Sequence, residues 1–183
     1  MSVCLFLVGI GSFLFHATLR QTAQYMDDLS MFALATALAH RLYSTIQSEN
    51  IKHIVTTSLL ILFGVMSSVY VRSGDLVLHT TCFAFLLTLV WPRTLYLIYC
   101  QKRSKQDRQI LVGRFAVAVL VLVVAFAIWN VDLEICYTLR DLRRMLGLPF
   151  GWLLEGHGWW HILTALGAKE YILLIRDLCE EDE

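Results

Sequence analysis

Residues 110–129, ILVGRFAVAVLVLVVAFAIW, form a run of twenty positions in which Arg114 is the one charged residue. A helix needs about 20 mostly apolar residues to cross the hydrocarbon core of a bilayer, so this run predicts a transmembrane helix. The whole chain of 183 residues is 57% hydrophobic and 16% charged. Soluble domains average about 25% charged residues. The composition therefore indicates a membrane protein.

Other apolar runs of similar length extend this prediction to an all-α, multi-span membrane protein with six transmembrane helices. We expect residues 1–183 to form a single transmembrane helical domain. The segment 130–150 mixes charged and apolar residues at helical spacing, which is typical of a short helix lying at the membrane interface. The six expected spans are 2–19, 27–47, 54–72, 77–99, 110–129 and 152–175.

Charge and cysteine content exclude several other classes of protein. The formal net charge is zero, and no basic block is large enough to bind a nucleic acid, so the bilayer is the expected partner. The five cysteines are scattered without a C-x-x-C pair, which favours small packing residues over a disulfide framework.

A basic cluster at 102–108, between the fourth and fifth spans, sets the expected orientation. With six spans, this cluster lies on the same side of the membrane as the C-terminal tail. Cytoplasmic loops are enriched in Lys and Arg, so we expect a cytosolic C-terminus. The cluster consists of Lys102, Arg103, Lys105 and Arg108.

Three histidines and an aspartate are expected at one membrane face. His16 ends the first span, Asp27 begins the second, and His157 and His161 begin the sixth. Successive spans run in opposite directions, so all four residues reach the same face. Ser12 and His16 are four residues apart, as are His157 and His161, so each pair projects from one side of its helix.

Three converging histidines with an open fourth position are the ligand set of a catalytic zinc. A single histidine in a membrane span is more often a hydrogen-bonded interior residue, and H-x-x-x-H is common by chance. The shared depth of His16, the pair and Asp27 favours the metal site. For Asp27 and Asp28, capping of the helix N-terminus is an alternative role. His79 begins the fourth span at the same face, and we expect it to support the site at most.

Three blocks of this sequence resemble the alkaline ceramidases, membrane amidases of a superfamily that also holds the adiponectin and progestin receptors. Residues 11–31, GSFLFHATLRQTAQYMDDLSM, resemble the family's G-S-x-x-F-H-x-T-L followed by D-E-L-P-M. WNVDLEIC at 129–136 resembles a W-N-x-D block with a nearby cysteine. GHGWWHILTALGA at 156–168 resembles H-x-W-W-H-I-L-T-G-L-G.

The resemblance implies that His16, His157 and His161 bind zinc, that Asp27 is the acid/base carboxylate, and that Ser12 supports the reacting oxygen. Zinc would lower the pKa of bound water toward about 7 and polarise the carbonyl. The implied reaction is hydrolysis of ceramide, dihydroceramide or phytoceramide to a sphingoid base and a fatty acid. The implied location is an internal membrane such as the endoplasmic reticulum or the Golgi.

The chain departs from the family pattern in two places. Asp27-Asp28-Leu29-Ser30-Met31 stands where the family has D-E-L-P-M. The family has a bundle of seven helices, and the resemblance starts at the second, so we expect an N-terminally truncated form. The family's N-terminal cluster associated with calcium has no counterpart, and no calcium site can be located on this sequence.

Two alternatives to an enzyme remain open from the sequence. The first is a non-catalytic zinc-containing membrane receptor, or an inactive truncated paralogue, of the same superfamily. The second is a helical transport or scaffold protein whose histidines never meet. Retention of Asp27 and Ser12 favours hydrolysis, because a purely structural metal would need neither residue.

Overall fold

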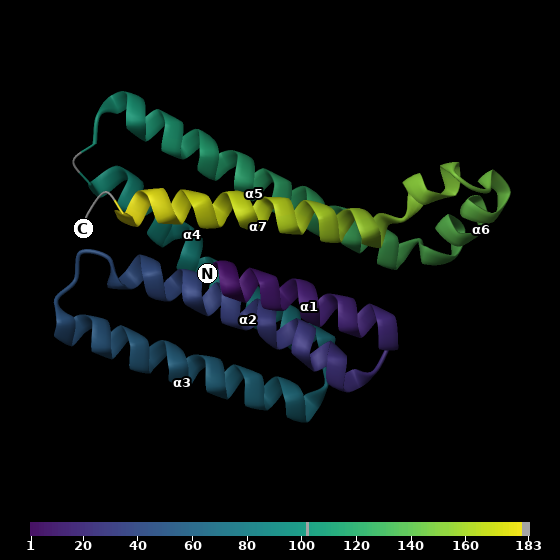
Figure 1. The fold of residues 1–183 in the computed structure, drawn as a ribbon, viewed down its shortest axis with the longest axis horizontal. Coiled ribbons are helices and arrows are strands. Elements are labelled where there is room, and N and C mark those ends of the chain that lie inside the picture. Colours follow the sequence, from purple (N-terminus) through teal and green to yellow (C-terminus); the bar gives the residue numbers. More distant parts are fainter. Residues whose placement is uncertain (102, 181–183) are drawn as a thin grey trace. The chain divides into compact units, whose positions relative to one another are not determined.

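The computed structural model describes residues 1–101 and 103–180, and over these residues it contains helices and no strand. The predicted all-α fold class is therefore confirmed (Figure 1). Lys102 of the basic cluster lies outside the described residues. The elements are α1 Ser2–Thr18, α2 Gln21–Ser44, α3 Glu49–Ser73, α4 Leu76–Cys100, α5 Lys105–Glu134, α6 Cys136–Leu146, the 3₁₀ helix η1 Phe150–Leu154, and α7 Gly156–Glu180.

Three helices within this part of the chain, α3, α4 and α5, are long and apolar enough to cross a membrane. The helix α1 is also apolar, but it has only 17 residues. Charged residues lie along both α2 and α7, so their role as membrane spans stays a prediction.

The helices α2 and α7 begin at residues that differ from the starts predicted by the apolar runs. The helix α2 begins at Gln21 after the N-cap residue Arg20, six residues before the expected start at 27. Asp27 and Asp28 therefore lie in its second turn, and the capping role considered for them is wrong. The early start has a simple cause: the first turn is polar, yet glutamine and alanine are good helix formers. The helix α7 begins at Gly156, four residues after the expected start at 152. Residues 150–154 form η1 instead, and Glu155 separates the two helices.

The chain divides into two compact units, which are described separately. The first comprises Met1–Gln109 and the C-terminal segment from Ile172 onward. In it α2 is central and packs against α1, α3 and α4. Leu19 adopts the left-handed backbone conformation that turns the chain between α1 and α2. The core of this unit is formed by Phe32, Ala35, Met66, Tyr70 and Leu86.

The second unit, Ile110–Tyr171, contains most of α5, the helix α6, η1 and the first part of α7. Close packing of α5 on α7 occurs at Gly167, where an added Cβ would lie 2.9 Å from the Leu122 side chain. The short helix expected within 130–150 is present as α6, and its location at the membrane interface stays a prediction. It contacts η1, and an ion pair between Arg143 and Glu155 ties it to the residue before α7. That residues 1–183 form one domain stays a prediction.

Candidate functional site

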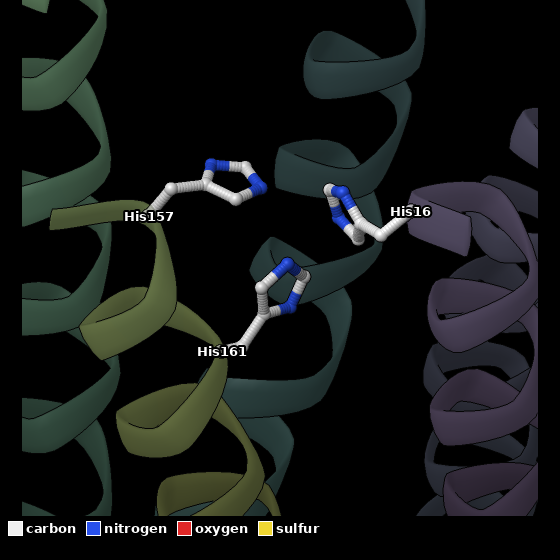
Figure 2. A group of neighbouring side chains, drawn as sticks. All are labelled: His16, His157 and His161. Atoms are coloured by element: carbon white, nitrogen blue, oxygen red, sulfur yellow. The ribbon is translucent and has the colours of Figure 1, made fainter. Parts of the chain in front are cut away.

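His157 and His161 lie one turn apart in the first two turns of α7, as their four-residue spacing predicts. Their ring centroids are 4.7 Å apart and their planes are nearly perpendicular. Each offers a nitrogen within 4.8 Å of a nitrogen on the other. Figure 2 shows both rings projecting from the same side of α7. Nitrogens bound to one tetrahedral zinc lie about 3.3 Å apart, so small side-chain rotations would fit the pair to the metal.

Trp160 contacts both imidazole rings of this pair. Its ring centroid lies 5.2 Å from that of His157 and 4.4 Å from that of His161. The Trp160 ring also contacts Trp129 of α5, with ring centroids 6.1 Å apart. Trp160, which lies between the histidines in the sequence, therefore packs against both rings.

Gly156, directly before His157, brings α5 against the turn that carries the first histidine. A Cβ at Gly156 would lie 3.0 Å from both Cβ and Oδ1 of Asp132. The Asp132 Oδ1 atom is buried and has no hydrogen-bond partner, an uncommon state for a carboxylate oxygen. Sequence reasoning assigned no role to Asp132, although it is the aspartate of the WNVD segment.

Ser12, His16 and Asp27 all belong to the first unit. Gly11 lets α1 and α2 approach at this point, because a Cβ there would lie 3.0 Å from the Cα and nitrogen of Asp27. The Ser12 side chain lies beside the Asp27 carboxylate. His16 lies one turn beyond Ser12, near the end of α1. Figure 2 shows its ring. The structure thus brings together Ser12 and Asp27, which the sequence predicted as partners in the site.

His16 belongs to the first unit, and the pair on α7 belongs to the second. Binding of one metal by all three histidines is therefore a proposal, which is made below.

A buried polar cluster next to Asp27 was missed from the sequence. The Tyr70 hydroxyl of α3 donates a hydrogen bond to the Asp28 carboxylate. The His79 ring of α4 places Nε2 3.3 Å from the Asp28 carbonyl oxygen. It stacks on Phe32 with ring centroids 4.7 Å apart. The sequence predicted a supporting role for His79 at most, and the structure places its ring against Asp28, the residue after Asp27. The contact with Tyr70 had no sequence signal, because tyrosine at a helix end also suits a membrane interface.

Comparison with known proteins identifies the family of this chain. A family model described as Ceramidase matches residues 1–182. Alkaline ceramidase 3 of Mus musculus is 25% identical over 175 residues, which cover 93% of this chain and 62% of the mouse protein. Alkaline ceramidase YPC1 of Saccharomyces cerevisiae is 29% identical over 186 residues, which cover 94% of this chain and 58% of the yeast protein. The chain therefore spans about three fifths of the length of these relatives. The match to the family model extends over nearly the whole chain, and the chain belongs to the ceramidase family.

Proposed function

We propose that this chain hydrolyses the amide bond of ceramide, dihydroceramide or phytoceramide, releasing a sphingoid base and a fatty acid. The observation that carries the proposal is the pair His157 and His161 on one side of α7 in a chain of the ceramidase family. Both curated relatives described above are named alkaline ceramidases.

We further propose that His16 joins the pair and that the three imidazoles hold one zinc ion. The donor set fits this metal, because three neutral imidazoles leave the fourth tetrahedral position open for water or substrate. When bound, zinc lowers the pKa of water toward about 7 and polarises a carbonyl oxygen. A calcium site of the family has no assigned residues in this chain.

The Asp27 carboxylate then acts as the proton carrier. It accepts a proton from the water whose oxygen bonds to the amide carbon, and it returns that proton to the nitrogen as the carbon–nitrogen bond breaks. The Ser12 hydroxyl, one helix turn before His16, lies beside this carboxylate. During the reaction the same hydroxyl can donate to the carbonyl oxygen that gains negative charge.

The substrate and the protein would share the bilayer. The helices α3, α4 and α5 are apolar enough to lie among lipid tails, where both chains of a ceramide also partition. We place the protein in an internal membrane such as the endoplasmic reticulum or the Golgi, with a cytosolic C-terminus. The basic cluster at 102–108, around the start of α5, supports the cytosolic C-terminus.

The test is ceramide hydrolysis and zinc content measured on the same purified protein in mixed micelles. Wild type should hold about one zinc per chain and release fatty acid from a fluorescent ceramide. His161→Ala should lose both properties. The matched control is His53→Ala, which changes an exposed histidine on α3 and should keep both.

Zinc retained without hydrolysis of any sphingolipid amide would contradict the enzyme assignment. That result would favour a non-catalytic, receptor-like member or an inactive truncated paralogue. Hydrolysis that survives in His161→Ala would contradict the metal assignment.

A further inference from the structure

Asp28 is a buried carboxylate that the proposed reaction does not use. It is 9% exposed, and its two partners are buried as well: Tyr70 is fully inaccessible and His79 is 5% exposed. A buried carboxylate is costly unless hydrogen bonds satisfy it. The network around Asp28 must therefore have a stabilising or positioning role.

The contacts of Asp28 connect three helices at one turn of α2. The Tyr70 hydroxyl reaches its carboxylate from α3, and the His79 ring reaches its carbonyl oxygen from α4. The same ring nitrogen lies 3.9 Å from Asp28 Oδ1. Side chain and main chain of one residue are thus held by two different helices.

This anchoring fixes the direction in which Asp27 points. Consecutive residues of an α-helix are rotated by about 100° about its axis. Because Asp28 faces α3 and α4, its neighbour Asp27 is directed toward α1, where it lies beside Ser12 and where Gly11 allows close contact. A rotation of α2 that freed Asp28 would also move Asp27 away from Ser12.

We propose that Asp28, held by Tyr70 and His79, is a positioning residue that keeps the Asp27 carboxylate in its place for proton transfer. The inference rests on the proposed function, since it takes Asp27 as the proton carrier. Asp28 itself exchanges no proton with the substrate.

The main test compares two tyrosine variants. Tyr70→Phe removes the donor to Asp28. The control Tyr43→Phe also removes one interhelical hydrogen bond, between Tyr43 of α2 and the Leu89 carbonyl of α4 at 3.2 Å. Tyr43 lies about 22 Å from Asp28 along the axis of α2. Misplaced catalytic groups lose rate in the chemical step, so Tyr70→Phe should lower kcat about tenfold, with KM within about twofold and zinc retained. Tyr43→Phe should leave all three unchanged.

Substitutions at Asp28 separate positioning from direct chemistry. Asp28→Asn keeps an oxygen that can accept from Tyr70, and its kcat should stay within about threefold of wild type. Asp28→Leu removes the acceptor and should behave like Tyr70→Phe. Loss of turnover in Asp28→Asn as large as in Asp27→Asn would overturn the positioning role, because the charge itself would then be required.

Amide hydrogen exchange of the zinc-free protein gives a readout that does not depend on catalysis. Residues 24–31 should exchange faster in Tyr70→Phe than in wild type or Tyr43→Phe, while the second half of α2 stays unchanged. Equal exchange in the two tyrosine variants, together with equal kcat, would overturn the inference. If wild type fails to hydrolyse ceramide, the proposed function falls, and the exchange result alone decides whether Asp28 anchors α2.

Discussion

Gly11 is the residue whose substitution tests the contact between α1 and α2 most sharply. In Gly11→Ala, the new Cβ would lie 3.0 Å from the Cα and nitrogen of Asp27 and 3.1 Å from the carbonyl carbon of Met26. All three are backbone atoms, so no flexible side chain can move aside. Carbon atoms pack at about 3.5–4.0 Å. The two helices must therefore separate locally by about 0.5–1 Å.

The energetic effect has two opposing parts. Overpacking of a tight contact costs about 1–3 kcal/mol, whereas alanine is favoured over glycine within a helix by about 0.5–1 kcal/mol. We expect a net loss of about 1–2 kcal/mol, which corresponds to a decrease in Tm of about 2–8 °C for a chain of this size. Turnover should fall as well, because the separation moves Ser12 away from Asp27.

The assay is thermal unfolding in detergent followed by circular dichroism, with ceramide hydrolysis measured on the same samples. The control is Gly9→Ala in the same helix, where an added Cβ meets nothing within 4 Å. Gly9→Ala should match or exceed wild-type stability and keep full turnover. Equal stability and turnover in the two variants would refute the close helix contact at Asp27.

Three further results are expected. Asp27→Asn should keep about one zinc per chain by atomic absorption and lower kcat by about 100-fold or more; unchanged kcat would exclude this residue as the proton carrier. Gly156→Ala should weaken zinc binding about tenfold in a chelator competition, because its Cβ would displace Asp132 and the turn that carries His157. Gly158→Ala has only an ordinary contact at 3.9 Å and should bind zinc like wild type. Removal of zinc by a chelator should stop hydrolysis, and one equivalent of zinc, but not magnesium, should restore it; turnover that persists without zinc would contradict a metal role.

The helical architecture could be predicted from the sequence because apolar runs of about 20 residues leave few other structures possible in a bilayer. Hydrophobicity locates the apolar part of a helix and not its ends. For this reason the start of α2 at Gln21, in a polar turn, was not predicted. The interruption of the helix at Glu155, between η1 and α7, was not predicted either.

Local parts of the site were also predictable. The spacing of His157 and His161 determines their common face, and the short connection after α1 brings Ser12 close to Asp27. The contact between Asp28 and Tyr70 joins residues 42 positions apart on different helices. It depends on how α2 and α3 are rotated against each other, which a pattern within one helix does not encode. The role of Gly11 likewise emerges only from the packed helices.

The most direct test of the account is X-ray absorption at the zinc edge on wild type and His16→Ala. Wild type should give three imidazole nitrogens at about 2.0–2.1 Å and one oxygen ligand. The His16→Ala spectrum should lose one imidazole and keep the two from α7. A wild-type spectrum with sulfur ligands, or one that His16→Ala leaves unchanged, would contradict a zinc site built from His16, His157 and His161.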